Sequence, residues 1–171
     1  MWIQLKRDFQ GRKCGEIINV PDAKAETLIE LGHAEPAKGP TQPIQMELCK
    51  IIISEMQDQQ IIVLKEVDGD RKFPIVIGSV EAEAIDRRLK GRPTQRPLTH
   101  DLLANIIEQL GGVIERIEVN NLENHTFFAR IHIRQNGKTL QIDSRPSDAI
   151  ALGIATTVPI FVAQHVLDEV C

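Results

Sequence analysis

The stretch from His125 to Ser144 constrains the fold more than any other part of the sequence. Two strand-like runs, HTFFARIHIR and KTLQIDS, flank the letters QNGK. Asn136-Gly137 supplies the positive φ angles that a type I′ turn requires, so the pattern predicts a tight β-hairpin. A hairpin joins strands that are adjacent in the sequence, and it therefore favours a sheet that is mostly antiparallel.

The strand-like and helix-like patterns of the larger part of the chain come in groups. Pro74 places its run at a sheet edge or a strand start, because proline has no N–H to donate to a ladder. Three helical patterns follow Ser79, Thr99 and Ser147, which we expect to cap the helices. This grouping predicts an α+β domain of mostly antiparallel sheet with three short helices. The other strand-like runs are 46–57, 59–67, 71–78, 113–121 and 159–163.

The beginning of the chain has the pattern of a small separate module. Strand-like residues 2–5 and 16–20 precede a helical pattern that ends at Gly32. The segment PAKGPTQP that follows has three prolines and one glycine, which is typical of a linker. Such a module either docks or tethers the chain, or it only decorates it. The predicted division is a β-β-α accessory module at 1–36, a linker at 37–45 and the larger domain at 46–171.

The composition limits the classes of function. The 171 residues carry a net charge of −4, so a nucleic-acid role must rest on a local basic patch or a metal. The chain has no tyrosine and one tryptophan, which argues against a broad stacking platform for single strands. We expect a cytoplasmic protein, because no apolar run is long enough to span a membrane and no leader precedes one. The three cysteines, which we expect to be reduced thiols, are Cys14, Cys49 and Cys171.

Two helix starts resemble each other. Residues 96–101 read RPLTHD and residues 145–148 read RPSD, and each runs into an apolar helical pattern. One interpretation is structural, because an acid in the first turn of a helix is stabilised by the helix dipole. That interpretation alone accounts for the three acids of the helix starts, Glu81, Asp101 and Asp148.

Capping explains the remaining residues of these starts less well. A protonated His100 gains nothing from the helix dipole, whereas a neutral imidazole can serve as a base or a metal ligand. Arg96 and Arg145 each precede a proline, whose extended backbone directs the guanidinium away from the helix that follows. A forked cation beside helix N–H groups suits a phosphate. The alternative is a structural network in which Arg145 pairs with Asp143 and Asp148.

Further cations lie in two places. The run RRLKGRPTQR at 87–96 contains five cations and no acid, and it is either a solvated helix end or a basic patch. The strand TFFARIHIR alternates, so that Arg130, His132 and Arg134 share a face with Phe128. That face is either simply hydrated or an extension of the basic surface.

FPIVIGSVEAEAI, RPLTHDLL, TFFARI and DSRPSDAIALGIATTVPIFV, in this order, resemble the bifunctional nuclease family. The resemblance runs from Met46 to Val170 and departs from the usual family phrase at Gly153, where alanine is usual. It implies an α+β domain that often forms homo-oligomers, with DNase and RNase activity. The recurring polar positions of the family correspond here to Glu81, Arg96, Thr99, His100, Asp101, Thr126, Asp143, Arg145, Ser147 and Asp148.

The hypothesis is a phosphodiesterase acting on DNA or RNA, assisted by a divalent Mg, Mn or Ca ion. Asp143, Asp148 and Asp101 are the predicted metal ligands, because carboxylates suit hard cations. His100 is the predicted general base or acid, and it shares the predicted catalytic role with Glu81, Asp101 and Asp148. The predicted phosphate-binding residues are Arg96, Arg145, Thr99 and Ser147.

The rival hypothesis is a non-catalytic oligomeric binding or regulatory module whose Arg-Asp motifs serve the fold. Burial and mutual bonding of Arg145 and Asp148 would favour this rival, whereas an open cleft shared with His100 would favour the nuclease. The sequence leaves open the choice between DNA and RNA, the direction of cleavage, the metal and the size of an oligomer.

Overall fold

The computed structural model describes residues 1–37, 42–54 and 59–171. The chain divides into two compact units, Met1–Gln42 and Pro43–Cys171. Residues 38–41 of the expected linker and 55–57 of the first expected strand of the larger domain lie outside the described residues. In the part of the chain that the structure describes, no helix combines the length and the apolar character that a membrane span requires.

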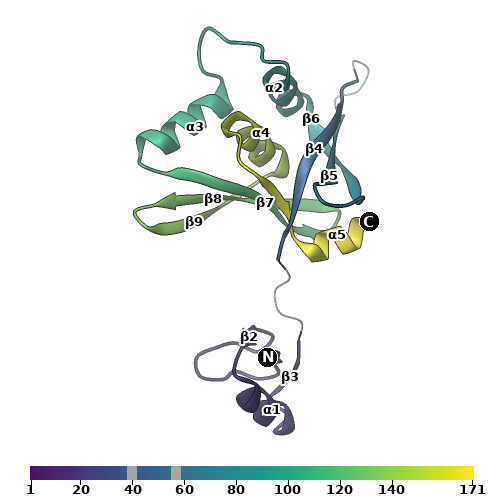
Figure 1. Cartoon of the computed structure of the whole chain (residues 1–171), viewed down its shortest axis with the longest axis vertical. Coiled ribbons are helices and arrows are strands. Elements are labelled where there is room, and N and C mark those ends of the chain that lie inside the picture. The colour runs from purple at the N-terminus through teal and green to yellow at the C-terminus, as the bar shows by residue number, and fades with distance from the viewer. Residues whose placement is uncertain (38–41, 55–58) are drawn as a thin grey trace. The chain divides into compact units, whose positions relative to one another are not determined.

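The first unit is a three-stranded antiparallel sheet with one helix (Figure 1). Gly32 ends the helix with a φ of 67°, as its position predicted. The sequence did not predict the third strand, because Pro36 marks the linker, yet Ile3 pairs with Pro36 and Leu5 with Ala34. The core of the unit consists of Ile3, Leu5, Ile18, Ala25, Leu28 and Ala34. The elements are β1 (Trp2–Leu5), β2 (Ile17–Asn19), α1 (Asp22–Glu30) and β3 (Ala34–Pro36).

The second unit is built on a seven-stranded sheet in the order β6-β5-β4-β10-β7-β8-β9. Every neighbouring pair is antiparallel except β10 and β7, so the α+β prediction with mostly antiparallel strands is confirmed. The strands are β4 (Ile44–Ile52), β5 (Gln59–Glu66), β6 (Lys72–Gly78), β7 (Val113–Glu123), β8 (Thr126–Gln135), β9 (Lys138–Ser144) and β10 (Ile160–Val162).

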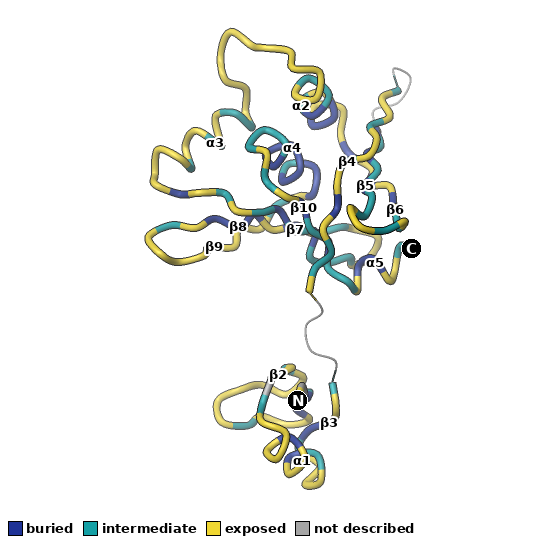
Figure 2. The backbone as a smooth tube through the Cα atoms, viewed as in Figure 1, coloured by how far each residue is buried: buried dark blue, intermediate teal, exposed yellow. Residues whose placement is uncertain are grey.

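Three helices cover one face of this sheet, and α4 lies between the other two (Figure 1). Seven residues of α4 are buried, whereas none of the residues of α3, all of which the structure describes, is buried (Figure 2). A fourth helix, α5, was not predicted, because the sequence was interpreted as ending in a strand. The helices are α2 (Ser79–Leu89), α3 (Thr99–Gln109), α4 (Pro146–Thr156) and α5 (Gln164–Val170).

The curvature of the sheet brings together strands that are not neighbours. The ring centroids of Phe73 in β6 and Phe127 in β8 lie 5.7 Å apart, although the two strands stand at different places in the order. Pro74 lies in β6, which is an edge strand, as the missing N–H of proline predicted. The edge strand β6 therefore faces the beginning of β8 instead of pairing with it.

The predicted hairpin is present, with φ angles of 50° at Asn136 and 75° at Gly137. The predicted polar face of β8 is only partly correct. Arg130 and Arg134 are exposed, but His132 is 4% exposed, and its Nε2 lies 2.8 Å from Oε2 of Glu118 in β7. The alternation predicted the face of each residue, but not which of them a neighbouring strand covers.

Candidate active site

The three helices that follow Ser/Thr residues do not begin as the sequence predicted. Ser79 and Thr99 are the first helical residues of α2 and α3, and Ser147 is the second of α4. The N-cap positions belong to Gly78, Leu98 and Arg145, and no side chain of those residues caps a helix. A hydroxyl caps only from the residue that precedes the first turn, so the capping prediction for all three Ser/Thr residues is wrong.

The two similar helix starts meet in space. His100, in the first turn of α3, places its Nε2 3.2 Å from Oδ1 of Asp148, in the first turn of α4. Arg145 donates from Nε to Oδ2 of the same aspartate at 2.7 Å. Both oxygens of Asp148 are therefore engaged, one by each helix start.

Arg145 extends the group to a third helix. Its Nη2 donates at 2.5 Å to Oε1 of Glu81 in α2, and the Glu81 side chain is buried. The hydrogen bond that Arg145 donates to Asp148, and then the one that it donates to Glu81, raise the pKa of Arg145, because both favour the charged guanidinium. We call Glu81, His100, Arg145 and Asp148 the helix-start network. The expectation that a pre-proline arginine points away from the following helix is wrong for Arg145, which bonds within its own helix start.

Glycine at the end of β6 makes room for the network. An added Cβ at Gly78 would lie 2.4 Å from Oε2 of Glu81. That distance is too short for any side chain, and the displaced atom belongs to a carboxylate that Arg145 already holds. Gly78 therefore leaves the space in which the Glu81 carboxylate binds Arg145.

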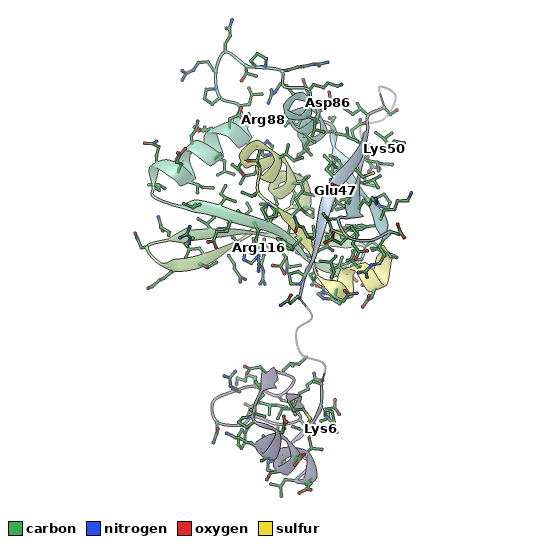
Figure 3. The ribbon with its side chains drawn as sticks, viewed as in Figure 1. Lys6, Glu47, Lys50, Asp86, Arg88 and Arg116 are labelled. Atoms are coloured by element: carbon green, nitrogen blue, oxygen red, sulfur yellow. The ribbon has the colours of Figure 1, made fainter. Side chains whose placement is uncertain are left out.

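The acid of the first helix start plays a different part. Oδ1 of Asp101 accepts from Nη2 of Arg88 at 2.6 Å, and Oδ2 accepts from the backbone N–H of Leu98 at 3.1 Å. Arg88 lies at the end of α2 beside α3 (Figure 3). Burial alone would raise the pKa of Asp101, but the bonds from Leu98 and Arg88 outweigh it and lower the pKa. Asp101 therefore accepts the backbone N–H at the start of its own helix and links α3 to α2 through Arg88.

Two grooves adjoin the helix-start network. The larger, with a volume of about 500 Å³, is lined by Gln59 and residues 74–78, 125–127 and 145–147, and we call it the strand-edge groove. The smaller, with a volume of about 200 Å³, lies between α2 and α3 and includes Arg87, Thr99 and His100; we call it the helix groove. Arg145 lines the first and His100 the second, so the network separates the two.

The remaining predicted site residues lie around this arrangement. Thr126 and Ser147 line the strand-edge groove, Thr126 at the exposed beginning of β8. Arg96 lies in the exposed segment between α2 and α3, and no described residue forms a salt bridge with it. Asp143 lies in β9 opposite Arg130 of β8, and the network does not include it.

The three predicted metal ligands are not brought together. Asp101 binds Arg88 and a backbone N–H, Asp148 binds His100 and Arg145, and Asp143 lies in another strand. Among the residues that the structure describes, no three His, Cys, Asp or Glu side chains form a group that could hold a metal ion. The metal set therefore stays a prediction from the sequence, and these side chains do not fit a metal as they stand.

Sequence reasoning missed several parts of the site. Arg88 was interpreted as part of a solvated helix end or a basic patch and not as a partner of Asp101, and Gly78 had no signal beyond its place before a helix. His125 was not among the predicted site residues, yet it lines the strand-edge groove. His132 was predicted only as part of a polar face, and its buried contact with Glu118 was missed; burial and then Arg116 lower its pKa, against the opposing effect of Glu118. Arg88 and His132 have their partners, Asp101 and Glu118, in other elements of the fold.

Comparison with known proteins gives this arrangement a family. Residues 62–171 match the model of the bifunctional nuclease domain. The chain belongs to the bifunctional nuclease domain family. All four residues of the helix-start network lie inside the matched segment, whereas the first unit lies outside it.

Individual relatives agree with this family. An uncharacterised protein of Mycobacterium tuberculosis is 35% identical over 125 residues, which cover 73% of this chain and 74% of that protein. Bifunctional nuclease 1 of Oryza sativa subsp. indica is 25% identical over 109 residues, covering 61% of this chain and 33% of the plant protein. Bifunctional nuclease 2 of Arabidopsis thaliana is 24% identical over 108 residues, with the same coverage. The chain thus spans about a third of these plant relatives.

Proposed function

We propose that this protein is a phosphodiesterase that cleaves DNA or RNA, with His100 as its general base. The observation that carries the proposal is the contact between His100 and Asp148, which joins two helix starts into one site. An imidazole held by a carboxylate is the arrangement that orients a catalytic base and stabilises its protonated form. The family, whose relatives include proteins named bifunctional nucleases, supports this chemistry.

In this proposal, the contact with Asp148 assigns the role of proton acceptor to one of the two ring nitrogens of His100. Because a carboxylate only accepts, Nε2 of His100 carries the hydrogen that Asp148 receives, and Nδ1 is left as the acceptor. Nδ1 takes a proton from the attacking water as the water oxygen forms its bond to phosphorus. The bond to the leaving oxygen then breaks, and the imidazolium returns the proton to that oxygen. Asp148 stabilises the imidazolium between these two events.

Arginines supply the charge that a phosphate requires. Two nitrogens of Arg145 are engaged by Asp148 and Glu81, which leaves Nη1, and the side chain is 68% exposed. Arg87 and Thr99 line the helix groove beside His100. The exposed Arg92 and Arg96 precede α3 and raise the local positive potential of a chain that is acidic overall. In this arrangement the phosphate lies above His100 and Arg145.

The proposed mechanism does not require a divalent metal. When bound, such an ion polarises a phosphoryl oxygen and lowers the pKa of water. The predicted ligands Asp101, Asp143 and Asp148 do not form a shell in this structure, so we assign no step to a metal. Cleavage rates with Mg²⁺, Mn²⁺, Ca²⁺ or a chelator measure whether the reaction depends on such an ion.

The test is cleavage of labelled single-stranded DNA and RNA by the purified chain, with Mg²⁺, Mn²⁺, Ca²⁺ or a chelator. His100→Ala is expected to lower the rate at least about 100-fold, the usual contribution of a general base. The matched control is His165→Ala, because His165 is an exposed histidine of α5, away from both grooves. Equal cleavage by wild type and His100→Ala, both folded by circular dichroism, would reject the proposal.

One observation favours assembly into homo-oligomers, which the non-catalytic alternative requires and which is also compatible with a nuclease. Helix α3 exposes Leu102, Leu103 and Ile106 at 53%, 39% and 45%, and Leu98 and Leu110 beside it are also exposed. Apolar surface of this kind marks an interaction site more often than a free surface. Sedimentation of the wild type and of Leu102→Glu/Ile106→Glu decides the point. A wild-type oligomer that the double variant dissociates supports assembly through α3, and a wild-type monomer excludes it.

A further inference from the structure

We propose that the strand-edge groove is the base-binding subsite of this site, and that the substrate is single-stranded nucleic acid. The proposal rests on the proposed function. It goes further, because it assigns the groove beside Arg145 to a nucleobase and excludes an intact duplex as the preferred substrate.

The first argument is continuity with the helix-start network. Gly78 and Arg145 line the strand-edge groove; Arg145 binds Glu81, and a Cβ at Gly78 would occupy the space of the same carboxylate. Arg145 also binds Asp148, which holds His100 at the helix groove. A strand whose phosphate lies at Arg145 and His100 therefore has one neighbouring nucleoside over each groove.

The second argument is the chemistry of the walls. Of the described residues that line the strand-edge groove, none is acidic, and Arg145 is the one with a fixed positive charge. Phe127 and His125 offer planar rings on one side, and Val76 offers an exposed aliphatic surface on the other. A neutral, planar base suits such walls, because stacking on a ring tolerates every base. Arg92 and Arg96, which form no salt bridge with a described residue, precede α3 on the side where the phosphates of the strand would follow.

The third argument is the edge strand β6. Residues 74–78 line the groove in succession, so the backbone of an edge strand forms one wall. Edge N–H and C=O groups can bond to the edges of a base. They are less suited to an added peptide strand, because Pro74 has no N–H and interrupts the ladder that a peptide would need.

These three features together favour single strands. A groove of about 500 Å³ holds a base only when that base has left its stack. Extruding a base from a duplex costs free energy, whereas a single strand presents its bases without that cost. The protein is therefore expected to bind and cleave single strands in preference to the matching duplex.

The experiment uses the full chain with His100→Ala, so that binding is measured without cleavage. Fluorescence anisotropy with a fluorescein-labelled oligothymidylate, alone or annealed to oligoadenylate, gives the two affinities. Val76→Trp fills the groove from an exposed position of a strand, where an aromatic residue is well tolerated. Its matched control is Val67→Trp, because Val67 is also exposed and lines neither groove.

Val76→Trp is expected to weaken binding of the single strand about tenfold, the effect of losing one stacked base, and Val67→Trp to leave it unchanged. His125→Asn keeps the left-handed backbone, because asparagine tolerates it, and is expected to weaken binding less. Unchanged affinity in Val76→Trp would overturn the base subsite. Equal affinity for the duplex would overturn the preference for single strands.

Three further outcomes separate this proposal from others. If wild type cleaves and His100→Ala does not, while Val76→Trp binds normally, the proposed function stands and the subsite alone is rejected. If wild type neither binds nor cleaves, both are rejected. A synthetic peptide of alternating valine and threonine that binds wild type but not Val76→Trp, with no oligonucleotide binding, would assign the groove to peptides and overturn the proposal.

Discussion

The two Arg-Pro helix starts read alike in the sequence and behave in opposite ways in the structure. In α3, Asp101 closes its own helix start, and Arg96 stands exposed without a salt bridge to any described residue. In α4, Arg145 binds the acid of its own start, and Asp148 reaches across to the other helix. The acid of the first start therefore binds its own backbone and α2, whereas the acid of the second binds the arginine of its own start and α3.

Burial explains the difference. α4 has seven buried residues, so its first turn is held close to α2 and α3, where Glu81 and His100 are within reach of Arg145 and Asp148. None of the residues of α3, a helix that the structure describes in full, is buried, and its acid finds partners in the segment just before it and at the end of α2. Similar motifs thus acquire different roles from the environments of their helices.

The largest contrast is expected in stability. Ile150→Ala in α4 removes a fully buried side chain and is expected to cost about 2–5 kcal/mol of unfolding free energy. Ile106→Ala in α3 removes one that is 45% exposed, and it is expected to change that free energy by no more than about 0.5 kcal/mol. Urea unfolding followed by circular dichroism measures both. Similar losses would mean that α3 is covered in solution, as in an oligomer.

The second contrast concerns activity. Asp148→Asn removes the charge that holds His100 and is expected to lower kcat about 10–100-fold, as is usual for a group that orients a functional histidine. Asp101→Asn is expected to leave kcat near that of the wild type, because Asp101 binds Arg88 and Leu98 and not Asp148, the residue that holds His100. Steady-state cleavage assays separate kcat from KM. Comparable losses in the two variants would remove the distinction between the helix starts.

The third contrast is the pH dependence of the stability that Asp101 contributes. Asp101→Asn is expected to cost about 1 kcal/mol at neutral pH, because a charged partner of a helix start is lost. The pKa of Asp101 lies below its ordinary value of 3.8, so its stabilisation is present above that value and is lost as the pH falls through the lowered pKa. Denaturant unfolding at several pH values should show the gap between wild type and variant closing in acid. A gap that is constant with pH would contradict this role.

The smallest effect is expected for Arg96. Arg96→Ala should change the unfolding free energy by no more than about 0.5 kcal/mol, because the arginine is exposed and no described residue pairs with it. If Arg96 neutralises one phosphate, the salt dependence of oligonucleotide binding should fall by a slope of about 0.7. Anisotropy titrations over a range of salt concentrations measure this slope, and an unchanged slope would place Arg96 outside the path of the strand.

Most of the fold could be predicted because its signals are local. The Asn136-Gly137 turn and the edge position of Pro74 follow from backbone chemistry, which depends on few neighbours. The third strand of the first unit and α5 escaped prediction, because a short strand beside a proline and a short terminal helix carry weak local patterns. The capping prediction failed by one or two residues, which is enough to move a hydroxyl from outside the helix to inside it.

The site could be predicted only in part. The sequence selected Glu81, His100, Arg145 and Asp148, and the structure brings these four into one network. It also grouped Asp101 and Asp143 with Asp148, which the structure does not. Contacts such as Arg145 to Glu81 join residues far apart in the chain, and neither spacing nor periodicity can report them. The roles of Gly78 and Arg88 depend on the same long-range packing.

The exposure of α3 has a consequence for local motion. α3 buries none of its own residues, so its local unfolding is expected to cost a small fraction of the free energy of global unfolding. Such separation breaks the contact from His100 to Asp148 while the core around α4 stays intact. Amide hydrogens of α3 should therefore exchange with solvent well before those of α4. On heating, the protein should lose the orientation of its histidine before it melts.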